Sequence, residues 1–384
     1  MKRFPILGLA LALLAAPAHA RDLTDDQFHD IAEDIFRPLM QELDIPGLAI
    51  GVTLDGRPHV FAEGFADRDT RRPVDADTLF ELGSVSKLFN VALAALAEEE
   101  GLLSLDAPVS QERPALKGSA FDRITLNDLA AHATGGLPLQ VPEGIVDDAS
   151  LNDYLAHWTP EGDPPQTLRS YSNVSIGLLG RITADRFGAS YDTALSEHLL
   201  PALGLNSTFV TVPEEAMDRY AFGYSRTGAP VRVNPGMLDA EAYGIRSTVT
   251  DMTRFLDAHL GNLDLPEPVD AALARTRVAG YDTAHFAQGM IWEGYPWPVD
   301  PAQLAAGNAP EMALTPQPLT RHDPQALQGL LNKTGATNGF GAYVAMVPSE
   351  RIGVVVLANR NYPNPVRAEA TRRLIHDLLQ AARD

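Results

Sequence analysis

Apolar positions near the start of the chain recur every three to four residues, the period of a helix with one buried face. The positions are Phe28, Ile31, Ile35, Leu39 and Leu43. Thr24 and Gln27 have the spacing of a capping box in front of this pattern, and the Ile-Pro-Gly sequence at 45–47 ends it. The pattern therefore predicts an amphipathic helix between Thr24 and residue 45.

Apolar runs at both ends of the chain predict paired strands. Near the N-terminus, residues 48–54 and 59–65 flank an Asp-Gly turn, which is a hairpin signal. Near the C-terminus, residues 341–347 and 352–358 flank a second turn. After Pro365, apolar positions at helical spacing predict a closing helix.

The middle of the chain is different, because helical patterns and loops predominate from Ser84 to Ala221. The simplest organisation is an α/β fold with α+β layers: a mainly antiparallel sheet built from both chain ends and flanked by helices, with an inserted, mostly helical region. We expect a single unit over 21–384, with the sheet region at about 21–80 and 222–384 and the helical region at about 81–221. The Pro-rich stretch at 310–318 is interpreted as a surface loop.

Residues 1–20 are interpreted as a secretory signal peptide. Lys2 and Arg3 precede a short apolar run, and Ala-His-Ala at 18–20 has the small-x-small form of a cleavage site. The alternative is an N-terminal membrane anchor, but the run is shorter than the ~20 residues that a span needs. We therefore expect a periplasmic protein with no membrane association.

Composition narrows the classes of partner and chemistry. The 384 residues include no cysteine, so disulfide and thiolate chemistry are excluded. A formal net charge of −20 argues against nucleic acid and anionic lipid as partners, and nothing in the sequence requires more than a monomer. The histidines form no His-Glu-x-x-His and no pair on one helical face, so we expect no metal and no cofactor. Without a Gly-x-Ser-x-Gly elbow, a Ser-His-Asp triad lacks support too.

The strongest chemical signal is the Ser-Val-Ser-Lys sequence that begins at Ser84. Ser84 stands at the predicted start of a helix that is apolar nearly all round up to Gly101, so we expect this helix to be buried. Lys87 lies three residues on and shares a face with Ser84. Burial lowers the pKa of a lysine until it can accept a proton, and a hydroxyl beside it can become a nucleophile without histidine. The alternative is that Ser84 only caps the helix while Lys87 extends into solvent.

Two further elements accompany this motif. Tyr171-x-Asn173 follows a Pro- and Gly-rich approach and precedes an apolar stretch, which predicts a loop or a helix start. The Lys-Thr-Gly-Ala sequence at 333–336 leads into the strand at 340–347, which predicts an exposed strand edge beside a site. Lys87 and Lys333 near a phenol would lower its pKa; the alternative is that Tyr171 is an ordinary core tyrosine.

In order and spacing, these elements resemble the Ser-x-x-Lys, Tyr-x-Asn and Lys-Thr-Gly motifs of penicillin-recognising serine enzymes. A closer resemblance is to class C β-lactamases. It is carried by five blocks at 79–87, 136–140, 234–244, 333–340 and 358–365. The blocks extend from the first hairpin to the final helix, so the resemblance covers essentially the whole chain after residue 20. It implies the β-lactamase/transpeptidase-like fold.

The resemblance implies four catalytic residues: Ser84, Lys87, Tyr171 and Lys333. Ser84 is the expected nucleophile, Lys87 and Tyr171 handle its proton, and Tyr171 activates the water that deacylates the enzyme. The expected oxyanion hole consists of the backbone N–H groups of Ser84 and Ala336. The expected substrate-binding residues are Gln140, Asn173, Tyr243, Thr334, Gly335, Ala336, Asn364 and Arg367.

Within this binding set, Gln140 and Asn173 are expected to hold the amide side chain of the substrate. The carboxylate is expected to meet Lys333, Thr334, Asn364 and Arg367, because a cation with hydroxyl and amide donors binds a carboxylate well. Plain structural alternatives exist for Gln140 as a solvent-facing loop residue, for Arg367 as a surface residue and for Tyr243 as a loop-packing residue. His132 and Asn332 depart from the residues expected in many relatives. These departures bear on the fine adjustment of the site and not on the expected mechanism.

The implied reaction is hydrolysis of the β-lactam amide of cephalosporins and penicillins through a Ser84 acyl-enzyme, which would give antibiotic resistance. Small β-lactams are the expected partners, and the sequence leaves the preference between the two groups open. A D-alanyl-D-alanine carboxypeptidase shares the three elements but differs in deacylation. An esterase of lactamase-like fold often lacks the Lys-Thr-Gly strand, which is intact here, and an inactive binding protein would keep the chemical residues for no reason.

Overall fold

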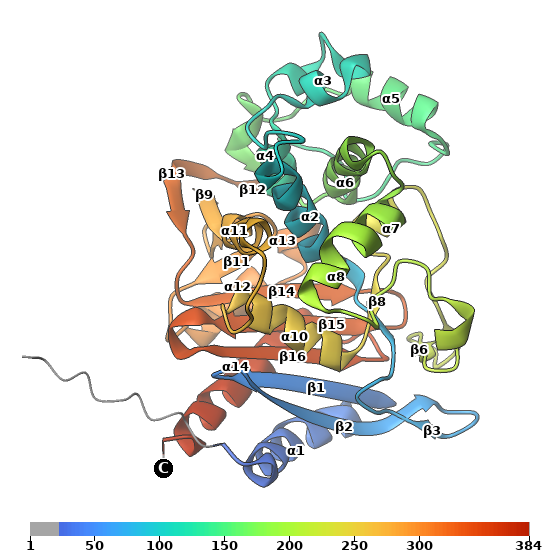
Figure 1. Ribbon diagram of the computed structural model, residues 1–384, viewed down its shortest axis with the longest axis vertical. Helices are drawn as coiled ribbons and strands as arrows, with labels where there is room; N and C mark the ends of the chain where they lie inside the picture. The colour runs from blue at the N-terminus through green and yellow to red at the C-terminus, as the bar shows by residue number, and fades with distance from the viewer. Residues whose placement is uncertain (1–22, 384) are drawn as a thin grey trace, which may run out of the picture.

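A computed structural model describes residues 23–383, and a 10-stranded antiparallel sheet forms its centre (Figure 1). In spatial order the strands are β13 (Thr320–Ala326), β9 (Val278–Asp282), β10 (Ala287–Gln288), β11 (Glu293–Tyr295), β14 (Leu330–Ala336), β15 (Gly341–Val347), β16 (Ile352–Ala358), β1 (Gly47–Leu54), β2 (Arg57–Asp67) and β3 (Arg72–Pro73). β1 pairs directly with β16, so strands from the two ends of the chain meet. The predicted sheet organisation is confirmed.

The central strands are buried along their whole length, because helices cover both faces of the sheet. Every residue of β1, β15 and β16 is buried. Successive residues of β15 alternate between two hydrophobic cores: Tyr343, Ala345 and Val347 belong to one, and Ala342, Val344 and Met346 to the other. This alternation is the two-residue period of a strand.

One face of the sheet is covered by helices from both chain ends. α1 (Asp25–Glu42) packs on α14 (Asn364–Ala381), which also contacts α12 (Pro301–Gly307). Thr24 and Gln27 form the predicted capping box in front of α1. The predicted first helix, both hairpins and the closing helix are therefore confirmed.

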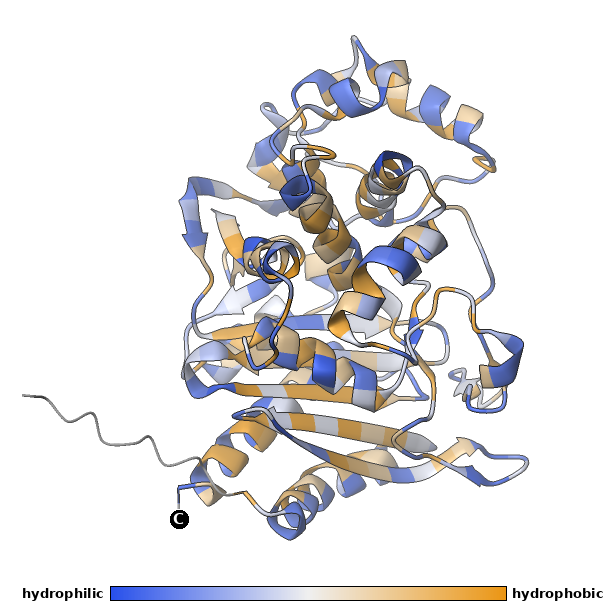
Figure 2. Ribbon diagram, viewed as in Figure 1, coloured by the Kyte–Doolittle hydropathy of each residue, from blue (hydrophilic) through white to orange (hydrophobic). Residues whose placement is uncertain are grey.

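The other face carries α10 (Val249–His259), which packs on β1 and β16, and beyond it the inserted helices. α2 (Lys87–Glu99) packs against both α6 (Asn173–Phe187) and α11 (Glu267–Thr276). Figure 2 shows α2 as almost uniformly hydrophobic, as a helix surrounded by protein must be. The shorter helices are α3 (Val109–Glu112), α4 (Leu126–Ala130), α5 (Asp148–His157), α7 (Tyr191–Ala194), α8 (Leu200–Leu203), α9 (Asp239–Ala242) and α13 (Glu311–Leu314).

Short elements complete the described chain. Three two-stranded pairs are β4 (Phe80–Glu81) with β8 (Arg246–Ser247), β5 (Leu168–Arg169) with β12 (Gln317–Pro318), and β6 (Gly223–Tyr224) with β7 (Pro230–Val231). The 3-10 turns are η1 (Gly83–Ser86), η2 (Pro114–Leu116), η3 (Ala120–Asp122), η4 (Pro165–Thr167), η6 (Glu214–Ala216) and η7 (Pro348–Glu350), and η5 (Leu195–Leu199) is a π-helical segment.

The interpretation of residues 310–318 as a plain surface loop was wrong. This stretch forms α13 and β12, and Met312 within it is buried. The predicted signal peptide at 1–20 lies outside the described residues. Among residues 23–383, no helix combines the length and apolar character that crossing a bilayer requires.

Candidate active site

Ser84 lies in the 3-10 turn η1, directly before α2. α2 is buried from Lys87 to Ala97, which fixes this turn in the interior of the molecule. Lys87 Nζ donates a hydrogen bond to Ser84 Oγ over 3.0 Å. The predicted buried helix is confirmed, although it begins at Lys87 and Ser84 lies in the turn before it; the two side chains are neighbours, as expected.

The Lys87 ammonium is fully buried among neutral oxygen atoms. Besides Ser84, it donates to Asn173 Oδ1 at 2.7 Å and to the backbone oxygen of Ala242 at 2.8 Å. Burial lowers the pKa of Lys87 to about 8; Tyr171 opposes this effect and Lys333 adds to it. Lys87 does not extend into solvent, so that alternative was wrong, and its ammonium can exchange a proton near neutral pH.

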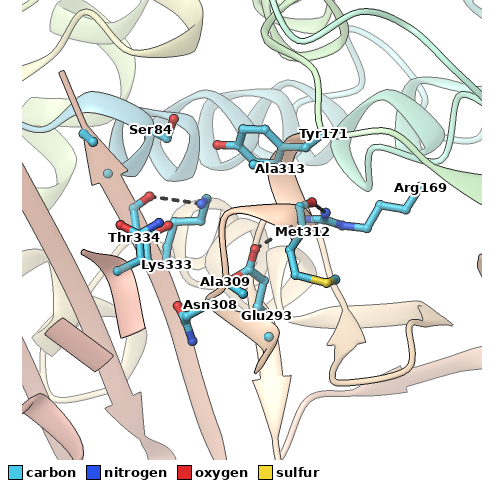
Figure 3. Close-up of a pocket in the computed structure, with 14 residues that line it drawn as sticks. Ser84, Arg169, Tyr171, Glu293, Asn308, Ala309, Met312, Ala313, Lys333 and Thr334 are labelled. Carbon is cyan, nitrogen blue, oxygen red and sulfur yellow. Dashed lines mark hydrogen bonds and ion pairs between the residues drawn. The ribbon is translucent and has the colours of Figure 1, made fainter. Parts of the chain in front are cut away.

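Tyr171 stands between two ammonium groups. The centre of its ring is 5.2 Å from Lys87 Nζ and 5.1 Å from Lys333 Nζ, and its hydroxyl points toward Ser84 (Figure 3). Burial acts to raise the pKa of the phenol, but Lys333 and then Lys87 outweigh it and lower the pKa to about 8. The phenol can therefore serve as a base near neutral pH, which an ordinary core tyrosine cannot.

Two glycines let the edge of β14 approach the serine turn. A Cβ atom on Gly335 would lie 2.0 Å from the backbone oxygen of Leu82. Gly83 has a φ of +53°, and a Cβ atom on it would lie 2.5 Å from the backbone nitrogen of Ala336. β11 pairs only with residues 330–332, so it ends before the part of β14 that faces η1. Backbone N–H groups of the turn and of the strand thus lie near one another, where they can stabilise an oxyanion.

A cavity of about 170 Å³ opens over these groups (Figure 3). Its lining residues are Ser84, Arg169, Tyr171, Glu293, Gly307, Asn308, Ala309, Met312, Ala313, Lys333, Thr334, Gly335, Ala336 and Asn364. A second cavity of about 140 Å³, between residues 136–139 and 313–316, shares Tyr171 and Ala313 with the first. The two form one cleft of small-molecule size, with the serine hydroxyl in its wall.

The predicted substrate-binding residues differ in how they meet this cleft. Thr334, Gly335, Ala336 and Asn364 line it. Asn173 and Gln140 are not among the lining residues of either cavity. Asn173, the first residue of α6, donates through Nδ2 to Gln140 Oε1 at 3.1 Å, and Gln140 is exposed. The N-terminus of α6 thus connects Lys87 to Gln140, since Asn173 forms a hydrogen bond with each of them.

Arg367 and Tyr243 also lie outside the lining of both cavities. Arg367 is not a surface residue of α14, because its side chain is fully buried. Its Nη1 donates to the backbone oxygen of Gly335 at 2.7 Å, so the guanidinium supports β14. Tyr243 is half-buried at the end of α9, next to the Ala242 carbonyl that binds Lys87.

A buried ion pair in the wall of the cavity was not predicted from the sequence. Arg169 donates to Glu293 Oε1 at 3.3 Å, to Gln288 Oε1 at 2.7 Å and to the backbone oxygen of Met312 at 2.6 Å. This fastens the wall segment of α13 to the strand that precedes Tyr171. Proximity to the Tyr171 motif was the only available signal for Arg169, and no local pattern marks its partners.

The two departures noted in the sequence lie beside this site. The His132 ring packs against the Tyr171 ring, with centroids 4.4 Å apart. Asn332 precedes Lys333 in β14 and donates to Asn308 Oδ1 at 2.9 Å and to Tyr343 Oη at 2.7 Å. Asn308 lines the cavity, so a buried amide network reaches the cleft from behind.

A hydroxyl, two ammonium groups and a phenol around one cavity define a serine hydrolase that works without histidine. Within residues 23–383, no cluster of three histidine, cysteine, aspartate or glutamate side chains is arranged to hold a metal ion.

Comparison with known proteins gives the family. The β-lactamase family model matches residues 32–379. A β-lactamase of Pseudomonas fluorescens is 43% identical over 348 residues, which cover 90% of this chain and 97% of that protein. Among solved structures, a β-lactamase from Sulfitobacter sp. EE-36 is 53% identical with a TM-score of 0.91, covering 94% of this chain and 99% of that one. A class C β-lactamase from Rhodobacter sphaeroides is 53% identical with a TM-score of 0.88, covering 90% and 99%.

The chain belongs to the β-lactamase family, and its solved relatives group it with the class C enzymes. The resemblance found in the sequence and the fold that it implied are both confirmed. The family match does not assign roles to individual residues; the geometry of the cleft is the basis for proposing them.

Proposed function

We propose that the chain hydrolyses the β-lactam amide of cephalosporins and penicillins through an acyl-enzyme on Ser84. The observation that carries the proposal is the Ser84 hydroxyl 3.0 Å from Lys87 Nζ, in a cleft that also contains Tyr171 and Lys333. Membership of the β-lactamase family and the class C enzyme at 53% identity support the substrate class.

In acylation, Ser84 Oγ attacks the β-lactam carbonyl carbon while its proton passes to the pair of Lys87 and Tyr171. Both members of this pair have a pKa of about 8, so a proton moves between them at little cost. The backbone N–H groups of Ser84 and Ala336 stabilise the oxyanion. The C–N bond then breaks, and the ring nitrogen takes up the proton from Tyr171.

In deacylation, a water molecule attacks the ester carbon of the acyl-enzyme. The Tyr171 oxygen removes a proton from this water, and the two lysines stabilise the negative charge on the phenol. Collapse of the second tetrahedral intermediate breaks the ester bond and returns the proton to Ser84 Oγ. Turnover of the β-lactam distinguishes this reaction from that of a D-alanyl-D-alanine carboxypeptidase, which hydrolyses its peptide but stays acylated by a β-lactam.

The proposed substrate contacts rest on two observations: Lys333, Thr334 and Asn364 line the cavity, and Asn173 connects Lys87 to the exposed Gln140. The carboxylate meets Lys333, Thr334 and Asn364, while Gln140 and Asn173 hold the amide side chain. Arg367 acts indirectly by holding the backbone of Gly335, because its own guanidinium is buried behind the strand. Tyr243 forms an outer wall of the substrate site.

The first test is steady-state turnover of a chromogenic cephalosporin by the protein without residues 1–20. The Ser84→Ala variant should lose at least about 10⁴-fold in kcat and keep its cooperative thermal unfolding, while Ser104→Ala at an exposed serine keeps full activity. If Ser84→Ala kept its turnover, Ser84 would not be the nucleophile. Stoichiometric acylation without turnover, with hydrolysis of a D-alanyl-D-alanine peptide, would move the chain to the carboxypeptidases.

We infer further that the enzyme is periplasmic and confers resistance, since residues 1–20 have the form of a signal peptide. Expression of the full chain in a Gram-negative host should raise the minimal inhibitory concentration of a cephalosporin. Periplasmic enzyme should begin at Arg21 by mass spectrometry. Active enzyme retained in the cytoplasm with its first residues intact would contradict this inference.

A further inference from the structure

A single residue, His132, contacts Tyr171 and both of its neighbours in the chain. The backbone oxygen of His132 accepts a hydrogen bond from the Ser170 N–H at 2.9 Å. Its Nδ1 accepts one from the Ser172 N–H at 3.3 Å. Between these two bonds, the imidazole ring lies against the Tyr171 ring at a centroid distance of 4.4 Å and an interplanar angle of 47°. The loop that carries the phenol is therefore held at three consecutive residues.

The backbone of His132 is shaped for this contact. The residue follows the short helix α4 and has a φ of +57°, in the left-handed region. Histidine, asparagine and aspartate adopt this region more readily than most residues. In this conformation the carbonyl and the ring of one residue both reach the 170–172 segment, and the side chain is buried.

The charge state of His132 suits a site already rich in cations. Lys87 on α2, Lys333 on β14 and Arg169 on β5 face the phenol, and Glu293 on β11 is the carboxylate that opposes them. Burial, and then Arg169, Lys87 and Lys333, hold the pKa of His132 well below its usual range. The imidazole is therefore neutral near pH 7, and because Nδ1 accepts a hydrogen bond, its proton is on Nε2.

We propose that His132 is a positioning residue that holds the Tyr171 oxygen between Lys87 and Lys333. Its two hydrogen bonds fix the loop backbone, and its ring fixes the direction of the phenol ring. The ring does this without bringing a further positive charge to the cluster. The effect on catalysis rests on the proposed function, whereas the effect on Tyr171 itself does not.

Three substitutions separate the contacts of His132. His132→Ala removes both the ring and the Nδ1 acceptor, His132→Phe keeps a ring, and His132→Asn keeps an acceptor on a residue that tolerates the left-handed backbone. The matched control is His259→Phe, because His259, the last residue of α10, is equally buried and packs against the rings of Phe255 and Trp292. Thermal unfolding of each variant shows whether it is folded.

The catalytic readout is kcat and KM on the chromogenic cephalosporin. His132→Ala should lower kcat about 10- to 100-fold, the cost of a catalytic group misplaced by about 1 Å, with KM changed less than about threefold. His132→Asn and His132→Phe should each recover part of the loss, and His259→Phe should retain the full kcat. An unchanged kcat in folded His132→Ala would overturn the proposal.

The second readout is independent of activity: ionisation of Tyr171, followed by NMR of ¹³Cζ-labelled tyrosine with the signal assigned by Tyr171→Phe. In His132→Ala the midpoint should rise from about 8 toward the ordinary value of about 10, because the phenol drifts from the lysines. An unchanged midpoint would overturn the proposal, even if the native enzyme turned over no β-lactam and the proposed function failed. Should His132→Ala not fold, the same two readouts on His132→Asn decide.

Discussion

At the scale of the residue, the cleft concentrates positive charge that is poorly compensated. Lys87 is fully buried, and its three hydrogen-bond partners are neutral oxygens of Ser84, Asn173 and Ala242. A buried ammonium without a carboxylate partner is disfavoured, so its pKa falls. The same lysine and Lys333 favour the charged form of Tyr171. Burial of the Lys87 ammonium and attraction of the Tyr171 phenolate to the two lysines bring both pKa values to about 8. A proton can then pass between Lys87 and Tyr171 with little change in free energy.

Removal of Lys333 should change the pH dependence of the reaction. Lys333 makes the largest contribution that lowers the pKa of Tyr171, so Lys333→Met should raise that pKa toward about 10. The acidic limb of the kcat/KM profile should then move to higher pH, and kcat/KM at pH 7 should fall at least about 10-fold. The control is Lys117→Met at an exposed lysine, which should leave the profile unchanged. An acidic limb at unchanged pH would contradict the claim that Lys333 lowers the pKa of Tyr171.

The sequence predicted the residues of the cleft unequally. Ser84, Lys87, Tyr171 and Lys333 could be found because each sits in a short motif whose order along the chain is informative. Arg169 and Glu293 could not, because their contacts join residues 124 positions apart and neither stands in a pattern. Arg367 was expected in the cleft, yet it lies behind β14; sequence fixes its place on the helix but not which side of a neighbouring strand it reaches.

At the scale of the element, the decisive feature is the close approach of β14 to η1. Gly335 and Gly83 have no side chains, and this absence brings the backbone of Ala336 next to the serine turn. Arg367 holds the same strand from the other side through the Gly335 oxygen. The proposed oxyanion hole therefore depends on the contact between two backbones and not on any one side chain.

A methyl group at Gly335 should separate these elements. Its Cβ would lie 2.0 Å from the backbone oxygen of Leu82, so β14 must move away from η1 in Gly335→Ala. Loss of one oxyanion donor costs about 10²- to 10³-fold in kcat, and we expect a fall of that size. Gly280→Ala in β9 is the matched control, because no atom lies within 4 Å of its Cβ position. Equal activity of the two variants would contradict this role of the strand contact.

Elements with strong local patterns were predicted well, and those set by distant contacts were not. The two hairpins and the first and last helices have turn residues, caps and periodic apolar positions within themselves. β10 and β11 are only two and three residues long, and β11 joins the sheet through β14, a strand more than 30 residues further along the chain. Residues 310–318 have the composition of a loop, but the bond from Arg169 to the Met312 carbonyl and the pairing of β12 with β5 give them structure.

At the scale of the whole molecule, the cleft lies where the sheet built from both chain ends meets the helical region. The turn η1 and the start of α2 place Ser84 and Lys87 at this junction, and β14 brings Lys333 from the sheet. Two hydrophobic cores, one on each side of the sheet, hold these elements in place. The stability of this framework tolerates a site that is itself unfavourable, a trade-off common in enzymes.

This trade-off should appear as a pH-dependent stability difference between Lys87→Met and the native enzyme. The folded-state pKa of Lys87, about 8, lies below its ordinary value of 10.5, so between these pH values the unfolded chain binds more protons. The native enzyme therefore gains stability as pH rises through this window, and the variant lacks this gain. Denaturant unfolding at pH 7 and 10.5 should show the variant losing about 3 kcal/mol relative to native. For Lys117→Met the difference in unfolding free energy from the native enzyme should not change with pH. The same result for Lys87→Met would contradict the claim that burial lowers the pKa of Lys87.

The most direct test of the account is to locate the covalent intermediate. Tyr171→Phe lacks the proposed base that activates water, whereas Lys87 remains beside Ser84 to accept its proton in acylation. During prolonged incubation with benzylpenicillin the variant should therefore accumulate an adduct of the intact drug, and digestion should place this mass on the peptide that contains Ser84. The native enzyme should show the adduct only transiently. No adduct, or an adduct on any other peptide, would contradict the assignment of Ser84 as the nucleophile and Tyr171 as the group that completes turnover.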